Sequence, residues 1–318
     1  MRDPGELYEL NPALTVPEGL PLIAGLTGFA DAGSGVSQLG TYLLGTLDSE
    51  VVATFDADIL LDYRARRPII YFDQDHLADY QPSTLKLHLV YDELRQPFLF
   101  LSGFEPDFRW EAFTEAVLGL IERYNVKSVT WVHSIPMPVP HTRPIGVTVS
   151  GNRRDLIEGM SIWKPQTQVP GNALHLLEYR LQQLSYPIAG FVLLIPHYLA
   201  DTEYPAAAIA GLESISAATG LIFPTDRLRE EDREFVANID EQVAGNVELG
   251  KLVGTLEERH DTYMEDTQLR SPLTDSDGEL PSADEIAAEL ENFLAFRRHG
   301  DDRRGDGRGD DDDPRTDR

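Results

Sequence analysis

Short apolar runs alternate with segments of helical periodicity along the first two thirds of the chain. An apolar run of four to eight residues is typical of a strand that is buried on both faces of a parallel sheet. Apolar residues spaced three and four apart are typical of an amphipathic helix. The repeated order of strand and helix predicts an α/β layered fold with a mostly parallel sheet. The clearest predicted strands are 22–26, 97–103, 126–133 and 190–196, and the clearest predicted helices are 108–124, 170–184 and 206–219.

Three further segments carry weaker patterns. Residues 85–93 (LKLHLVYDE) alternate apolar and polar, which predicts a half-exposed edge strand with His88 at an ordinary strand position. Residues 60–67 followed by 69–72 favour a strand pair or an extension. Four prolines between Pro136 and Pro144 predict a stiff extended loop, excluded from a central strand, that forms the rim of a pocket.

The character of the sequence changes at Asp226. We therefore expect an α/β core domain over 1–225 and a charged helical appendage over 226–298, with a second helix at 284–298. The last segment, 299–318, is rich in Asp and Arg and has no apolar residue, so it is predicted to be a disordered acidic tail.

The stretch 21–45 reads as a strand, a tight loop and a helix. Its loop, GFADAGSG, places Gly28 and Gly33 at the spacing of a phosphate-binding loop, but Ser34 stands where such a loop needs lysine. Asp31 or Ser34 is expected to cap the helix that follows. Two readings stay open: a cradle for phosphate or carboxylate, and a tight turn or subunit contact, which we favour because both nucleotide motifs are incomplete.

Ligands of open α/β sheets bind beyond the carboxyl ends of the strands. Three segments meet that condition: the GFADAGSG loop, the proline-rich loop with its histidines, and the segment after the last strand. They predict one pocket or interface, whose candidate residues are Gly28, Asp31, Gly33, Ser34, His133, His141, His197 and Glu203. His and carboxylate side chains suit general acid–base chemistry on a glycosidic or ester bond.

No residue is assigned a catalytic role, because the sequence has neither a GxSxG nucleophile elbow nor closely spaced metal ligands. No metal and no cofactor are expected.

The composition narrows the possible partners. The chain has 318 residues and no cysteine, which excludes disulfides and thiolate metal sites. Its formal net charge of −27 opposes binding to nucleic acid and to anionic membranes. The N-terminus does not resemble a signal peptide, and no run of about 18 apolar residues occurs, so we expect a cytoplasmic protein.

Three segments give the chain a resemblance to a known family. GFADAG at 28–33, VPGNALHLL at 169–177 and YPAAA at 204–208 resemble the proteasome assembly chaperone 2 family, especially its uncharacterised actinobacterial members. The resemblance covers about residues 20–220. It implies a three-layer α/β/α domain similar to nucleoside phosphorylases, a homo-oligomer such as a trimer, and proteasome subunits as partners. It supplies no catalytic residues.

Two hypotheses for the function follow. The first is a non-enzymatic homo-oligomeric interaction protein related to proteasome assembly chaperones. The alternative is a small-molecule-binding protein, or a hydrolase-like or phosphorylase-like enzyme, that uses Asp31, His133, His197 and Glu203 at the strand ends.

Overall fold

The computed structural model describes residues 4–164 and 166–266, and these residues form one compact unit. The described part is built around one eight-stranded sheet, with a separate two-stranded ribbon. The strands of the sheet are β1 (Tyr8–Leu10), β2 (Pro21–Thr27), β3 (Ser49–Phe55), β6 (Leu85–Tyr91), β7 (Pro97–Phe104), β8 (Ser128–Met137), β9 (Gly146–Gly151) and β10 (Ile188–Pro196).

The strand order in the sheet is β1-β3-β6-β7-β2-β8-β10-β9. The four central strands β7, β2, β8 and β10 run parallel to one another, and every pairing outside them is antiparallel. The predicted α/β/α fold is therefore confirmed, with a sheet that is mixed: parallel at its centre and antiparallel on both flanks. The parallel centre brings the carboxyl ends of β2, β7, β8 and β10 to one edge.

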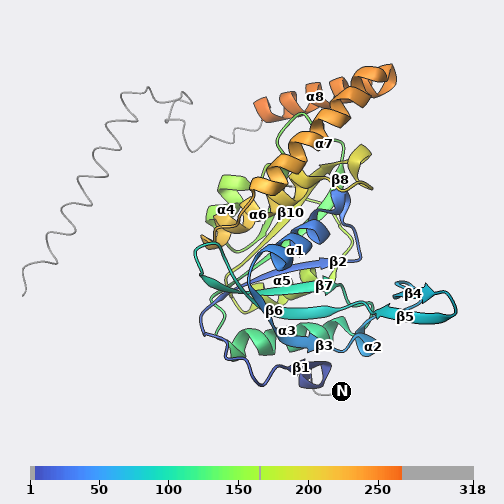
Figure 1. Cartoon of the computed structure of the whole chain (residues 1–318). Coiled ribbons are helices and arrows are strands. Elements are labelled where there is room, and N and C mark those ends of the chain that lie inside the picture. Colours follow the sequence, from blue (N-terminus) through green and yellow to red (C-terminus); the bar gives the residue numbers. More distant parts are fainter. Residues whose placement is uncertain (1–3, 165, 267–318) are drawn as a thin grey trace, which may run out of the picture. The chain divides into compact units, whose positions relative to one another are not determined.

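Helices cover both faces of the sheet (Figure 1). The buried apolar residues form two clusters, one on each face of the sheet. The first includes residues of α3 and α5, and the second includes residues of α1, α4 and α6. The helices are α1 (Gly35–Thr46), α2 (Ala57–Leu60), α3 (Trp110–Arg123), α4 (Arg154–Met160), α5 (Ala173–Gln183), α6 (Pro205–Thr219), α7 (Asp226–Gly245) and α8 (Val247–Asp266), with short 3₁₀ turns at η1 (Pro4–Leu7), η2 (Ala32–Ser34) and η3 (His197–Leu199).

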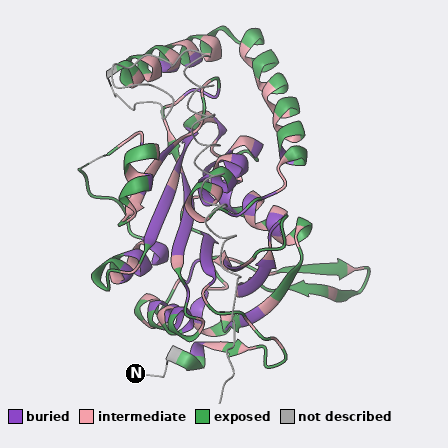
Figure 2. Cartoon of the chain, turned by 90° about the vertical axis from the view of Figure 1, so that its left-hand side faces the viewer, coloured by how far each residue is buried: buried purple, intermediate pink, exposed green. Residues whose placement is uncertain are grey.

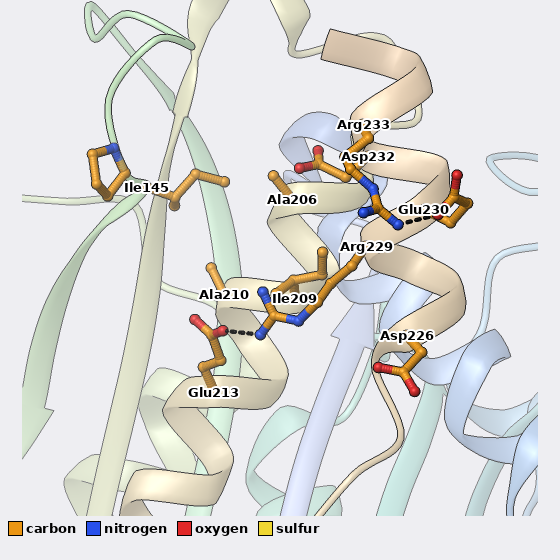
Figure 3. Close-up of a pocket in the computed structure, with 11 residues that line it drawn as sticks. Ile145, Ala206, Ile209, Ala210, Glu213, Asp226, Arg229, Glu230, Asp232 and Arg233 are labelled. Atoms are coloured by element: carbon orange, nitrogen blue, oxygen red, sulfur yellow. Dashed lines mark hydrogen bonds and ion pairs between the residues drawn. The ribbon is translucent and has the colours of Figure 1, made fainter. Parts of the chain in front are cut away.

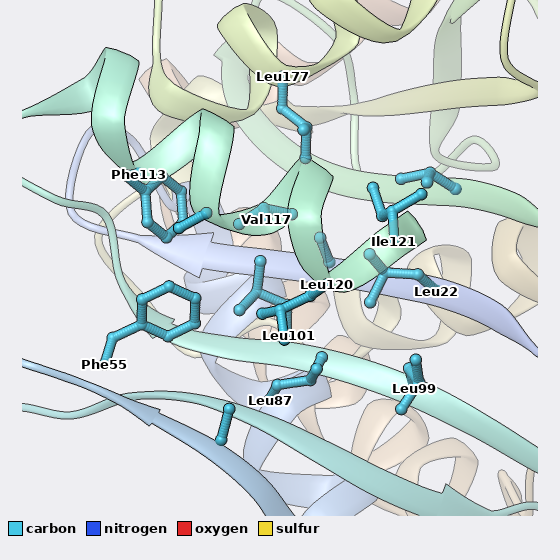
Figure 4. Packing of buried hydrophobic residues seen from close by; sticks show 14 of the residues in the cluster. Leu22, Phe55, Leu87, Leu99, Leu101, Phe113, Val117, Leu120, Ile121 and Leu177 are labelled. Atoms are coloured by element: carbon cyan, nitrogen blue, oxygen red, sulfur yellow. The ribbon is translucent and has the colours of Figure 1, made fainter. Parts of the chain in front are cut away.

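The core on the α3 face shows how apolar spacing fixes the layers. Phe113, Val117, Leu120 and Ile121 lie on one side of α3 and point at the leucines of β2, β6 and β7 (Figure 4). Fully burying a side chain of this size contributes about 1.5–3 kcal/mol. Phe108, which the sequence pattern placed on this helix, precedes it and is half exposed.

Two strand predictions are wrong in an instructive way. β6 was expected at an edge, but it lies between β3 and β7 and is almost wholly buried, with His88 inside the sheet. β8 continues through Pro136 into the proline-rich segment. Beyond Trp131, β8 pairs with β10 on one side and on the other meets only a single bridge from Asp31. A missing proline N–H therefore costs little there.

The segment 57–81 also differs from expectation. Residues 57–60 form α2, and the ribbon pairs β4 (Ile69–Asp73) with β5 (His76–Gln81), a partner that the pattern did not reveal. This ribbon, which we call the arm (residues 69–81), projects from the body (Figure 1) and carries mostly exposed residues (Figure 2).

The helices after residue 225 extend the fold. α7 packs on α6 through buried Leu228 and through Phe235, whose ring lies 5.3 Å from that of Tyr204. α8 follows after a break at Asn246. The predicted helix at 284–298 and the predicted tail at 299–318 lie outside the described residues. Over the described residues, no helix is both long and apolar enough to span a bilayer.

Candidate functional site

The carboxylate of Asp31 lies at the N-terminus of α1. Its two oxygens accept hydrogen bonds from the backbone N–H groups of Val36 (2.7 Å) and Ser37 (3.0 Å), and Oδ1 also accepts one from the Ser134 hydroxyl (3.1 Å). The start of a helix is where free N–H groups and the helix dipole favour an anion. The chain fills this position with its own carboxylate, which opposes the reading of the loop as a phosphate cradle.

The rest of the loop is crowded against its own chain. The N–H of Gly33 donates to the carbonyl of Ala200 (2.8 Å), and the carbonyl of Gly33 accepts from the N–H of Tyr204 (2.9 Å). A Cβ at Gly33 would lie 3.2 Å from both Ile195 and Tyr204. Ser34 takes the left-handed conformation at the helix start, and its side chain makes no capping bond. The small residues thus form a tight turn packed on η3 and α6.

His133 lies on β8 at the same edge and is 4% exposed. Its ring stacks on Phe29, with the ring centroids 5.7 Å apart and the planes 9° from parallel. Its Nε2 is buried and has no hydrogen-bond partner among the described residues. Burial lowers the pKa of His133 to about 4, with a smaller effect of His175 in the same direction and an opposing effect of Asp31. The ring is therefore neutral near pH 7.

Two polar side chains near the start of α5 were missed from the sequence: Glu105, which is buried, and His175, which is half-buried. Glu105, just after β7, accepts a hydrogen bond from the N–H of Ala173 at the start of α5 (2.6 Å), and burial raises its pKa. His175 accepts from the N–H of Asn172 (3.1 Å), while Asn172 caps α5 in return. The segment VPGNALH could have indicated this helix start, because Asn three residues before a side-chain acceptor is typical of a capping box.

Gly28 lies at the exposed side of this edge. Its positive φ of 127° favours glycine, and a Cβ there would lie 2.9 Å from a guanidinium nitrogen of Arg66, whose flexible side chain would have to shift. Arg66 pairs with Asp107 and stacks over Phe104, at 5.5 Å from the ring centroid. Arg66 thus links the segment before β4 to the end of β7 and the loop that follows it.

His141 and His197 gather around Tyr198 instead. The Tyr198 hydroxyl accepts from the backbone N–H of His141 (2.8 Å) and lies 2.7 Å from Nδ1 of the same residue. Since the hydroxyl has one hydrogen to give, it donates to Nδ1, and Nε2–H then donates to Asp240 of α7 (3.2 Å). His197 is exposed, with its ring edge toward Tyr198. This cluster fastens α7 to the proline-rich loop.

Glu203 belongs to a third place. It is exposed and lines a groove of about 490 Å³ between α1 and α7, together with Gln38, Tyr42 and Arg227. The eight predicted residues therefore occupy three local groups: the strand-end turn with His133, the Tyr198 cluster, and the α1–α7 groove.

A larger groove, of about 680 Å³, lies between α6 and α7 (Figure 3). Its floor is apolar, with Ile145, Ile209 and Ala210. Both arginines on its walls are paired within the chain, Arg229 with Glu213 and Arg233 with Glu230. Asp226 and Asp232 also line it, and Oδ1 of Asp232 is buried without a hydrogen-bond partner among the described residues. It contains none of the eight candidate residues. Among the described residues, no group of three or more His, Asp or Glu side chains could hold a metal ion.

The comparisons with known proteins agree with this fold. The family model described as the PAC2 family matches residues 25–243, which is more than half of the chain. The chain belongs to the PAC2 family. No curated protein matches it.

Solved structures extend the comparison. A Mycobacterium tuberculosis protein of unknown function is 41% identical, with a TM-score of 0.78 over 84% of this chain and 92% of its own. A Corynebacterium glutamicum ATCC 13032 protein of unknown function is 34% identical, with a TM-score of 0.80 over 82% of this chain and 99% of its own. A M. tuberculosis proteasome-assembly chaperone homologue shares the fold at 21% identity, with a TM-score of 0.67 over 74% and 100% of the two chains.

The PAC2 model covers some parts of the molecule and leaves others outside the matched range. All eight predicted residues, the arm and most of α7 fall within the matched range, whereas α8 (Val247–Asp266) lies beyond it. The strand-end turn and the arm therefore lie within the part of the chain that the PAC2 model covers.

Proposed function

We propose that this chain is a non-enzymatic, self-associating interaction protein that acts as an assembly chaperone. One observation carries the proposal: the residues of the arm, which are mostly coloured as exposed in Figure 2, include large apolar side chains. The exposed fractions are between 46% and 69% for Ile69, Ile70, Tyr71, Phe72, Leu77 and Tyr80.

An isolated two-stranded ribbon is at best marginally stable in water, because neither face is covered. Apolar side chains gathered in one place on a surface mark a protein interface, and each Å² of apolar surface that leaves water contributes about 25 cal/mol. A partner that covers the arm would remove these apolar side chains from water, which the rest of this chain does not do.

The strand-end turn supports the same conclusion. The carboxylate oxygens of Asp31 accept hydrogen bonds from the N-terminus of α1 and from the Ser134 hydroxyl. Gly33 forms backbone hydrogen bonds with other parts of the same chain. Of the two readings of the GFADAGSG loop, these contacts favour the structural one.

Light scattering of the purified chain tests self-association, and the family resemblance gives a trimer as the expected species. The variant F72S/L77S should shift the population toward the monomer. The control L94S/L184S removes leucines that are 60% and 65% exposed elsewhere and should leave the mass unchanged. A wild-type chain that stays monomeric at tens of micromolar would overturn the proposal.

We further propose proteasome subunits as the clients and the cytoplasm as the location. The support is the shared fold with a proteasome-assembly chaperone homologue. Purified proteasome α subunits from the same organism should co-elute with the chain in size-exclusion chromatography. Separate elution of the two at 50 µM each, where even a Kd of about 10 µM gives substantial complex, would contradict this assignment.

A second candidate function, small-molecule binding at the strand ends, has one observation in its favour. His133 keeps an unpartnered buried nitrogen beneath a half-exposed Phe29. A ligand at a hundred times its Kd would stabilise the fold by about 2.7 kcal/mol. Thermal shift against nucleosides, phosphate and sugar phosphates, repeated with H133F, tests it: a shift that H133F abolishes supports the site, and a flat panel removes it.

A further inference from the structure

We infer that the tip of the arm of one copy docks on the surface around the arm's base in a second copy. This inference rests on the proposed self-association and names the two surfaces that meet. It starts from the charges at the two ends of the arm, which are opposite in sign.

The base of the arm carries three available arginines beside carboxylates that are engaged within the chain, such as Asp58, which accepts from Tyr63, and Asp107, which pairs with Arg66. Arg64, Arg67 and Arg109 are exposed, and none of them forms an ion pair with another described residue. The loop before Arg109 lies beside the segment that leads to Arg64 and Arg67, because the N–H groups of Asp107 and Phe108 both donate to the carbonyl of Leu60. We call Arg64, Arg67, Phe108 and Arg109 the root surface. Its phenylalanine is 50% exposed and gives the surface an apolar centre.

The tip of the arm is acidic. Asp73 and Asp75 flank the turn between β4 and β5, and Asp75 has 92% of its side chain exposed. Their cationic neighbour is His76, 3.0 Å from Asp75, and it is charged only when protonated. Between the tip and the root surface lies the apolar part of the arm, including Phe72, which pairs with Leu77.

Charge complementarity identifies the partner as a second copy of this chain. With a net charge of −27, two copies repel one another over most of their surfaces, so association needs a locally basic patch. The root surface is such a patch, with three cations not used inside the described chain. An acidic tip followed by an apolar ribbon matches a basic surface with an exposed phenylalanine, and each copy carries both halves.

Charge reversal tests the pairing. R64E/R67E and, separately, D73K/D75K should each weaken self-association on the order of tenfold or more, because like charges then face each other. The variant with all four changes restores opposite signs and should recover the wild-type mass. The control K127E/K251E reverses two exposed lysines elsewhere and should have no such effect. Arg66 is left intact in every variant because it pairs with Asp107.

Cross-linking gives a second readout that does not depend on the size of the charge effect. The chain has no cysteine, so D75C and R109C can be prepared as single-cysteine chains. A bismaleimide should join D75C chains to R109C chains in a mixture, and should not join D75C to a K127C control.

Three results would overturn the inference: an oligomer unchanged by both reversals, no rescue by the four-fold variant, or cross-links only between D75C tips. An oligomer that persists through both reversals leaves the proposed self-association standing, whereas a monomeric wild type removes both.

Discussion

The hydroxyl of Ser134 donates a hydrogen bond to the carboxylate of Asp31, 3.1 Å away and 103 residues earlier in the chain. This bond joins β8 to the turn before α1, at the point where the pairing of β2 with β8 has ended. The same carboxylate holds the first turn of α1. Asp31 thus fixes the position of α1 relative to the centre of the sheet.

Asp31→Ala should lower the free energy of unfolding by about 1–3 kcal/mol, because it removes a helix cap and leaves the buried hydroxyl of Ser134 unpartnered. Asp31→Asn should cost less, since an amide oxygen still caps the helix. Urea unfolding measures both, with Glu122→Ala, at an exposed position of α3, as the control. Equal losses for Ala and Asn would show that capping is not the cause.

Gly33→Ala should destabilise the fold by more than Gly220→Ala. Both glycines have positive φ, 67° and 76°, so both substitutions carry a similar backbone cost of about 1 kcal/mol. Only Gly33 is closely packed; the space around a Cβ at Gly220 is empty within 4 Å. The extra loss at Gly33, about 1–3 kcal/mol, measures the packing of the turn. Equal denaturation midpoints would refute it.

Leu177→Ala on α5 should cost about 2–5 kcal/mol, because its fully buried side chain leaves a cavity against the α3 face of the core. Leu184→Ala, at the end of the same helix and 65% exposed, should stay within about 0.5 kcal/mol of the wild type. Chemical denaturation of the two variants tests the assignment of layers. Similar losses would mean that α5 does not cover the sheet.

Acid should weaken the fold partly through His133. Its pKa is about 4 in the folded chain and about 6.5 when unfolded, so the unfolded chain binds the extra proton between these values. Stability from this group is complete above pH 6.5 and is lost as the pH falls toward 4, by up to about 3 kcal/mol.

His133→Phe should therefore flatten the decline of unfolding free energy between pH 6.5 and 4. The comparison must be made against the wild type, because buried Glu105 and Glu178 have raised pKa values and act in the opposite direction. An unchanged slope in H133F would show that the His133 ring is protonated in the folded chain.

Much of the fold could be predicted from residue patterns. β2, β7 and β10 are short, apolar and buried, and α3 and α6 keep strict helical spacing, so local sequence was sufficient. β6 was misplaced because Lys86 and His88 imitate the alternation of an edge strand while the sheet buries His88. The order in which strands pair depends on contacts between segments far apart in the sequence, so the alternation of residues within one strand does not reveal it.

The candidate site was predicted only in part. The turn from Gly28 to Ser34 and His133 meet at one edge, as parallel strands require. Glu105 and His175 were missed because each is a single polar residue beside an apolar run, and their proximity depends on α5 returning to the end of β7. His141 and His197 instead contact Tyr198, an association that no spacing rule reveals.

The ribbon of β4 and β5 leaves and re-enters the body at positions that face each other, with Ile69 opposite Gln81. Because its two ends adjoin, the ribbon can be shortened, lengthened or exchanged for another segment while the eight-stranded sheet keeps its register. Changes confined to this ribbon can therefore alter its length and its exposed surface without disturbing the fold of the body.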